Sequence, residues 1–207
     1  MRRVLVLSLF VLLFLSTIPL TWSQNGYCPA GTTLCLNDVF QLVFFDNAFN
    51  RFRTDQTIRI VNPGVQGNPI TANEGKVCAD IYVFNANQQM EECCACPLTA
   101  NDLLQLGLRS NLLQNPMIGR PDEGVILIIS DTGSNCDPTS PIPTPNLRAS
   151  IEHLEVIPAP KVSPLFSPGT PSLTDTAFEE SELSTHELQT LGSTCAKVIG
   201  TNACTCS

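Results

Sequence analysis

Cysteine is the residue type in this sequence with the most chemical potential. Ten of the 207 residues are cysteine, and five of these fall in two short clusters, Cys93-Cys94-Ala95-Cys96 and Cys204-Thr205-Cys206. Thiolates this close could bind zinc or an iron–sulfur cluster, but such sites favour Cys-x₂-Cys pairs and a compartment that keeps thiols reduced. We therefore expect no metal and no cofactor, and we interpret the cysteines as disulfide partners.

An even number of cysteines in an exported chain is typical of a disulfide framework, here of up to five bridges. A bridge between the neighbours Cys93 and Cys94 would be strained, so we expect them to reach separate partners. The spacing does not determine the pairing. The disulfide candidates are Cys28, Cys35, Cys78, Cys93, Cys94, Cys96, Cys136, Cys195, Cys204 and Cys206.

Other residues could support catalysis only in combination. Asp131-Thr132-Gly133 follows the apolar run Val125–Ile129, which is the local pattern of an aspartic protease. That chemistry needs two aspartates that share a proton, and the sequence contains no second Asp-Thr-Gly. The two histidines, His153 and His186, have no Gly-x-Ser-x-Gly motif beside them. We interpret all three residues as structural, and we expect no catalytic site.

The stretch 162–196 is acidic and contains no lysine or arginine. Ser184 and Glu187 fit a capping box, which predicts a helix over residues 184–199. A solvated face that compensates the helix dipole is favoured over a calcium site for the acidic side chains. These side chains are Asp175, Glu179, Glu180, Glu182 and Glu187.

The central stretch has the best strand pattern. Val77–Phe84 alternates with apolar residues on both faces, which predicts a central strand covered on both sides. Asn85-Ala86-Asn87 predicts a turn, and Gln88–Ala95 a returning strand on which Cys93 and Cys94 point to opposite faces. Pro97 is expected to stop the pairing.

Further strands are predicted on either side of this hairpin. Val39–Phe45 reads as a strand or as one face of a helix. The five phenylalanines of Val39–Phe52 are expected in the core rather than on a ligand platform. Asp102–Leu108 is favoured as a strand over a helix capped by Thr99 and Asp102. The remaining expected strands are Thr57–Val61, Val125–Ile129 and His153–Ile157.

Residues 137–175 are rich in proline, which cannot donate to a strand ladder. This stretch predicts a surface loop region with one short strand. Residues 1–23 have the pattern of a signal peptide, with a basic start, the apolar run Val4–Leu15 and small Thr21 and Ser23 before the expected cleavage site. We expect 24–207 to be a single disulfide-rich domain with no membrane span.

The net charge of −8 at pH 7, without a cluster of lysine or arginine, argues against a nucleic acid as partner. A protein or surface partner and self-association both stay open. The expected location is secreted, periplasmic or on the cell surface.

The central stretch also resembles a group of uncharacterised exported bacterial proteins. The shared features are Cys78, Tyr82 and Phe84, then a Gln-x-Met-x-x-Cys-Cys-x-Cys return from Gln88 to Cys96, then Thr99, Asn101 and Leu103. A Cys-x-Cys end after Cys195 fits as well. The resemblance implies an exported, disulfide-bonded protein and no particular mechanism.

Together these patterns predict a mainly β fold: a disulfide-stapled antiparallel β-sandwich with a Pro-rich excursion and one C-terminal helix. The favoured function is a non-enzymatic binding or cell-envelope-associated module. The alternatives are a small secreted hydrolase and a structural subunit of an extracellular assembly. A polar pocket with convergent carboxylates would favour the hydrolase, and a flat or aromatic-rimmed exposed patch would favour the binding module. A long uncovered sheet edge, or self-association, would favour the subunit.

Overall fold

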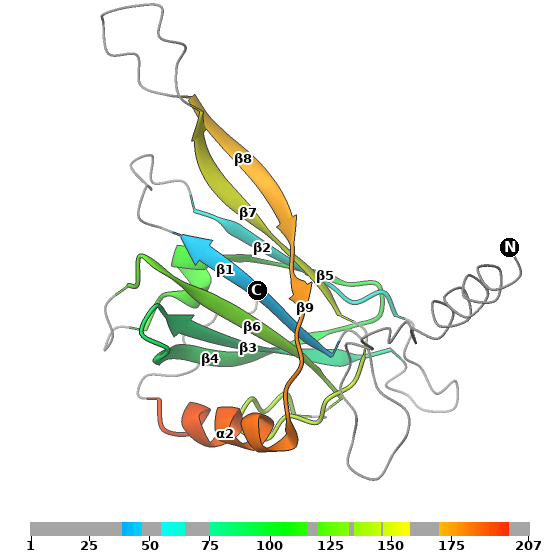
Figure 1. Cartoon of the computed structure of the whole chain (residues 1–207). Helices are drawn as coiled ribbons and strands as arrows, with labels where there is room; N and C mark the ends of the chain where they lie inside the picture. Colours follow the sequence, from blue (N-terminus) through cyan, green and yellow to red (C-terminus); the bar gives the residue numbers. More distant parts are fainter. Residues whose placement is uncertain are drawn as a thin grey trace, which may run out of the picture.

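Two antiparallel sheets pack face to face, which confirms the expected mainly β sandwich (Figure 1). The computed structural model describes residues 39–46, 55–64, 75–115, 120–132, 135–145, 147–157 and 170–198. The first sheet has the order β4-β3-β6-β1-β9 and the second the order β5-β2-β7-β8. The strands are β1 (Phe40–Asp46), β2 (Thr57–Val61), β3 (Val77–Asn85), β4 (Met90–Leu98), β5 (Leu103–Gly107), β6 (Glu123–Asp131), β7 (Arg148–Ile157), β8 (Thr170–Ala177) and β9 (Glu179–Glu180).

The main core lies between the two sheets, because each strand directs alternate side chains inward. Val43 and Phe45 of β1 and Ile81 of β3 meet Ile58 and Ile60 of β2 there. The other set of side chains on the first sheet forms a second apolar cluster on its outer face. That outer face carries the candidate site described below.

The central hairpin is confirmed. β3 lies between β4 and β6 and is buried on both faces, as its alternating apolar pattern predicts. The expected stop at Pro97 is wrong, because Pro97 pairs with Cys78 and β4 continues to Leu98. β4 is the edge strand of the sheet, where a proline without an N–H is tolerated.

Two open alternatives are resolved in favour of strands. β1 is a strand, with Phe40 on the outer face and Phe45 in the core. β5 is a strand as well, and the Asp102 carboxylate caps only the preceding turn, where it accepts from the main-chain N–H of Thr99 at 3.2 Å. A π-helix over Leu108–Leu112 follows β5 and was not predicted.

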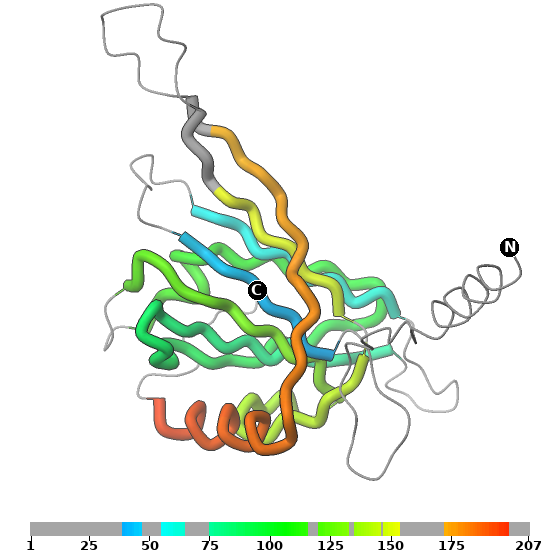
Figure 2. Tube along the Cα trace, viewed as in Figure 1, coloured from blue at the N-terminus to red at the C-terminus, as the bar shows by residue number. Residues whose placement is uncertain are grey.

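The Pro-rich excursion over 137–175 is only partly a loop. All of β7 and most of β8 lie within this region, and β7 begins before the expected His153. β8 pairs with β7 as far as Ala177, and the chain then crosses to the first sheet, where β9 pairs with β1 (Figure 2). The crossing links the two sheets along one side of the sandwich.

Helix α2 (Thr185–Cys195) forms a third layer on the outer face of the first sheet (Figure 1). The predicted capping box is present, with Ser184 as the N-cap and Glu187 at the third helical position. The helix ends at Cys195 rather than at the expected Ile199. In the described part of the chain, no helix is long and apolar enough to cross a membrane.

Asn62 joins the end of β2 to the neighbouring turns and provides a first prediction. Its side chain is fully buried, donates to the carbonyl of Thr99 at 2.9 Å and accepts from the N–H of Gly64 at 2.9 Å. Replacing Asn62 by alanine removes these hydrogen bonds and leaves the Gly64 N–H without its side-chain acceptor, so we expect the free energy of unfolding to fall by about 2–3 kcal/mol. Urea unfolding measures the change. Asn87→Ala, on the exposed turn, is the control and should change it by less than about 0.5 kcal/mol.

Candidate functional site

Two disulfides fasten segments onto the outer face of the first sheet. Cys93 of β4 is bonded to Cys195 of α2, with 5.8 Å between the Cα atoms. Cys78 of β3 is bonded to Cys136, with a Cα separation of 5.4 Å. Cys94 and Cys96 are disulfide-bonded as well, so Cys93 and Cys94 do reach separate partners. Cys28, Cys35, Cys204 and Cys206 lie outside the described residues.

Helix α2 covers one half of this outer face. Leu188, Leu191 and Cys195 are buried there in one cluster with Tyr82 and Cys93 of the sheet. Gly192 permits the close packing, because a Cβ at this position would lie 2.3 Å from the carbonyl oxygen of Thr139. The segment 135–145 is thus held between the helix and the sheet.

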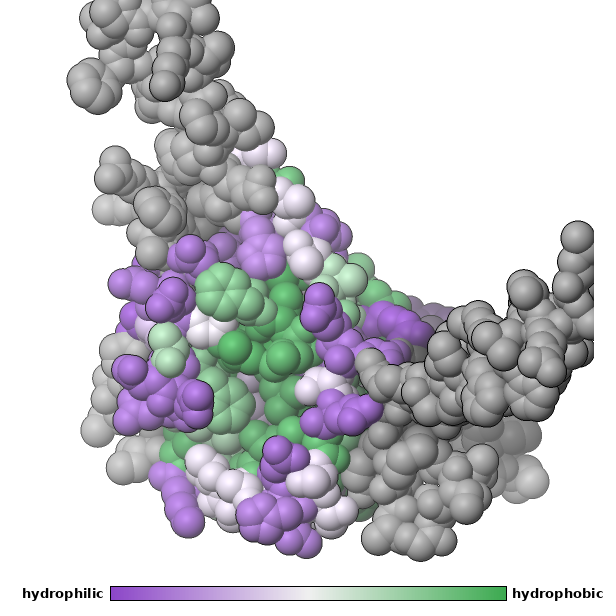
Figure 3. Space-filling view, viewed as in Figure 1, coloured by the Kyte–Doolittle hydropathy of each residue, from purple (hydrophilic) through white to green (hydrophobic). Residues whose placement is uncertain are grey.

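The other half of the face is uncovered and forms an apolar groove beside α2. Its cavity volume is about 910 Å³. Figure 3 shows the hydrophobic residues gathered in one patch at the centre of this face, with hydrophilic residues around it. The apolar side chains of the groove come from β1, β6, β3 and β4 and include Leu42, Phe44, Val125, Leu127, Phe84 and Met90.

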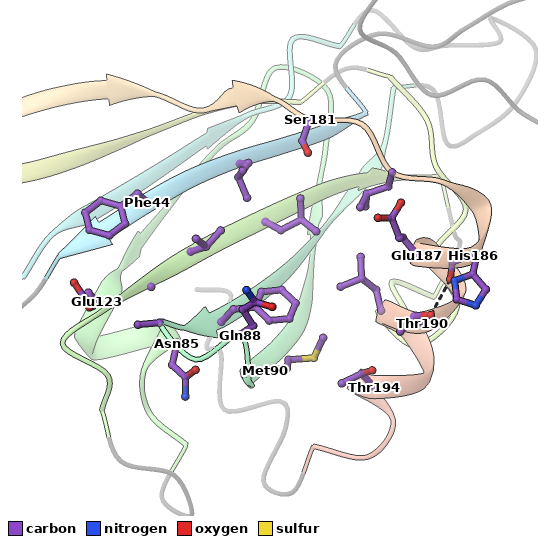
Figure 4. A pocket seen from close by; sticks show the side chains of 18 residues that line it. Phe44, Asn85, Gln88, Met90, Glu123, Ser181, His186, Glu187, Thr190 and Thr194 are labelled. Carbon is purple, nitrogen blue, oxygen red and sulfur yellow. Dashed lines mark hydrogen bonds between the residues drawn. The ribbon is translucent and has the colours of Figure 1, made fainter.

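Polar side chains line the rim of the groove. His186, Glu187, Thr190 and Thr194 of α2 lie at one end, and Glu123 lies at the other, next to the apolar Phe44 (Figure 4). The Ser184 hydroxyl donates to the Glu187 carboxylate at 2.6 Å and lowers the pKa of Glu187, which therefore stays charged. The groove accordingly combines an apolar floor with an acidic rim.

The exposure of Phe44 differs from what the sequence predicted. The phenylalanines of Val39–Phe52 were expected in the core. Phe45 is buried between the two sheets and Phe40 in the outer-face cluster, whereas Phe49 and Phe52 lie outside the described residues. Phe44 instead lies on the outer face, 53% exposed, and Leu42 two residues earlier is 37% exposed. Both side chains point away from the core because they occupy the alternate positions of β1.

A second feature of this face is a buried pair of carboxyl groups, Asp80 of β3 and Asp131 of β6. Asp80 is 0% and Asp131 1% exposed. Asp131 accepts from the main-chain N–H of Ile142 at 2.9 Å. The hydroxyl of the neighbouring Tyr82 donates to the carbonyl of Pro138 at 2.7 Å. The sheet thus presents this polar cluster to the segment 135–145 that covers it.

The environment keeps Asp80 protonated. Burial, followed by the charge of Asp131 and a hydrogen bond to it, and then the charge of Asp137, raises the pKa of Asp80 to about 8. Burial and the nearby carboxylates also raise the pKa of Tyr82. A neutral Asp80 avoids placing a second negative charge beside Asp131 in the buried part of the sheet.

Asp80 therefore lies beside Asp131 as a second aspartate, which the Asp-Thr-Gly pattern lacked in the sequence. Sequence reasoning missed Asp80, and the available signal was a single carboxylate in an otherwise apolar strand, two residues from Cys78. The Cys78–Cys136 disulfide and the hydrogen bonds from Ile142 and Tyr82 hold the covering segment in place. A substrate cannot reach the two carboxyl groups in this structure, because the segment 135–145 covers them. Their contacts hold this segment against the sheet.

The remaining residues singled out in the sequence are dispersed. His186 lies on the groove rim, and His153 lies half-buried in β7. Asp175 lies 3.8 Å from Arg59 on the second sheet, whereas Glu187 belongs to the capping box. Among the described residues, no three histidine, cysteine or acidic side chains gather as metal ligands.

Comparisons with known proteins add little to this geometry. No protein-family model and no curated protein matches the chain. A solved structure, the Anabaena sensory rhodopsin transducer, is similar with a TM-score of 0.33 and 12% sequence identity, over 47% of this chain and 91% of that chain. A similarity this weak carries no argument about fold or function.

Proposed function

We propose that this chain is a binding module, secreted or held in the cell envelope, whose ligand occupies the apolar groove beside α2. The main support is the uncovered apolar half of the outer face, where Phe44 is 53% exposed. A contiguous exposed apolar patch rimmed by polar residues is typical of an interaction site. The groove volume of about 910 Å³ also lies within the usual range of ligand sites.

Two alternatives have less support. A hydrolase needs reactive groups that its substrate can touch, whereas Asp80 and Asp131 are buried beneath 135–145. A subunit of an assembly is favoured by β8, which is the last strand of the second sheet and pairs only with β7 in the described part of the chain. Size-exclusion chromatography tests that alternative directly, because an assembly would elute above the monomer mass.

The exported location has support from the cysteine chemistry. Disulfides persist in oxidising compartments such as the periplasm and the cell exterior. Two disulfides lie within the described residues, and Cys94 and Cys96 are bonded as well. The signal-peptide pattern of residues 1–23 and the resemblance of the central stretch point the same way.

Binding of the neutral apolar dye Nile red tests the groove. We expect its fluorescence to rise on saturable binding to the protein. Phe44→Asp places a charge on the apolar floor beside the acidic rim, so we expect the dye to bind at least about tenfold more weakly. A fluorescence titration of the two proteins measures the change.

Leu103→Asp is the matched control. Leu103 is 50% exposed, close to the exposure of Phe44, but it lies on β5 in the other sheet. This variant should bind the dye as the unaltered protein does. Equal losses in both variants, or no saturable binding at all, would contradict the proposed site.

A further inference from the structure

The edge of β1 next to the groove is only partly covered. β6 pairs with β1 along one side from Phe40 to Asp46. On the opposite side β9 pairs with Gln41 and Leu42 only. In the described part of the chain, no strand pairs with β1 beyond Leu42 on that side. A sheet edge of this kind can accept an additional strand.

The hydrogen-bond pattern shows which main-chain groups face this edge. The N–H of Ser130 in β6 donates to the carbonyl of Val39 at 3.0 Å, and the N–H of Ser181 donates to the carbonyl of Phe40 at 2.9 Å. Main-chain groups alternate in direction along a strand. Phe40, Leu42 and Phe44 therefore direct their N–H and C=O groups away from β6, and those of Phe44 lie beyond the end of β9.

A second hollow, the β1–β8 notch, opens at this edge with a volume of about 310 Å³. It exists because β8 leaves the neighbourhood of β1 to pair with β7 (Figure 2). Its lining includes Leu42, Phe44, Val125, His153, Thr176 and Glu179. The first three also line the apolar groove, so notch and groove are continuous around Phe44.

The open edge of β1 ends at Asp46, whose carbonyl accepts from the Gln56 side chain at 2.8 Å. The open edge is therefore short. The acidic residues that line the groove or the notch are Glu123, Glu179 and Glu187. Neither hollow is lined by a lysine or an arginine of the described ranges. Such an acidic border complements a ligand that carries basic side chains.

We infer that the ligand of the groove is an extended peptide segment that adds to β1 as a short antiparallel strand beyond β9. Alternate apolar side chains of this segment lie over Phe44 and Val125, and lysine or arginine side chains at its two ends meet the acidic border. This inference rests on the proposed function of the groove. A peptide ligand differs from a small apolar ligand in one respect, because it forms main-chain hydrogen bonds with Phe44.

A fluorescein-labelled peptide of alternating valine and threonine residues, with a lysine at each end, tests the inference by fluorescence anisotropy. In an antiparallel pair, residues opposite each other share a face, so the valines over the groove also direct their N–H groups at β1. N-methylation of the valines should therefore weaken binding at least about tenfold, because it removes these donors. N-methylation of the threonines, whose N–H groups face away from β1, is the control and should change affinity by less than about threefold.

Amide hydrogen exchange gives a second measurement on the unaltered protein. Bound peptide should slow the exchange of the Phe44 amide by at least about tenfold, whereas the Val43 amide faces β6 and should not change. Equal effects of the two N-methylated peptides, or an unchanged Phe44 amide in the complex, would overturn strand addition.

The outcomes separate this inference from the proposed function. If Nile red binds and the peptide does not, the groove remains a binding site and the peptide inference is wrong. If neither binds, both are wrong. A dimer on size-exclusion chromatography, with the Phe44 amide protected in the absence of peptide, would show that a second copy covers this edge and would also overturn the inference.

Discussion

Replacing Cys93 and Cys195 together by alanine is expected to lower the free energy of unfolding by about 4–5 kcal/mol. The bond links residues 102 positions apart, so its loss frees a long loop in the unfolded chain. It also removes the covalent anchor of α2 on β4. A helix of 11 residues is marginal without its packing, so we expect α2 to detach. Guanidinium unfolding followed by circular dichroism measures both effects.

The Cys78→Ala and Cys136→Ala double variant is the control for this prediction. Its bond closes a loop of similar order, 58 positions, so the loss of stability should be comparable. It fastens the segment 135–145, on which α2 packs, rather than the helix itself. We therefore expect Nile red binding to fall less in this variant than after loss of the Cys93–Cys195 bond. Unchanged unfolding of the first variant would contradict the role of the anchor.

Asp80→Asn is expected to change how stability depends on pH. Asp80 has a pKa of about 8 in the folded protein and the ordinary value of 3.8 when unfolded. Between these values the folded state binds the extra proton, so stability falls as pH rises through this range. The loss is on the order of 4–6 kcal/mol between about pH 4 and pH 9.

Asparagine has a similar shape and no charge, so the variant should not lose this stability. Its curve should meet that of the unaltered protein near about pH 4 and lie above it at alkaline pH. Asp131, Asp137 and Tyr82 surround the position and are present in both proteins, so the difference between the curves isolates Asp80. Urea unfolding at a series of pH values measures it. Parallel curves would show that Asp80 is already ionised in the folded protein.

The two large effects act on the same layer of the molecule. The Cys93–Cys195 bond holds α2, and the Asp80–Asp131 pair lies under the segment on which Gly192 of α2 packs. One wall of the groove therefore depends on both. We expect alkaline pH to weaken Nile red binding in the unaltered protein more than in Asp80→Asn, because ionised Asp80 repels Asp131 beneath the segment.

Local patterns in the sequence determined the elements whose partners are near in the chain. β3 and β4 were predictable because an alternating apolar run, an Asn-rich turn and a returning run follow one another directly. Helix α2 was predictable because its capping box is a local hydrogen-bond motif, although its last turn was not. The oxidised state of the cysteines followed from their number and from the expected compartment.

Only the tertiary structure decided the features that depend on distant neighbours. β7 and β8 form in a Pro-rich stretch because β7 pairs with the edge of β2 and β8 then pairs with β7. The proline content of the sequence does not reveal this pairing. Asp80 and Asp131 become a pair only because β3 lies beside β6. Phe44 is exposed because α2 covers the other half of the outer face and leaves this half open. Alternation along a strand specifies which side chains share a face, whereas the packing of the whole chain determines which face is covered.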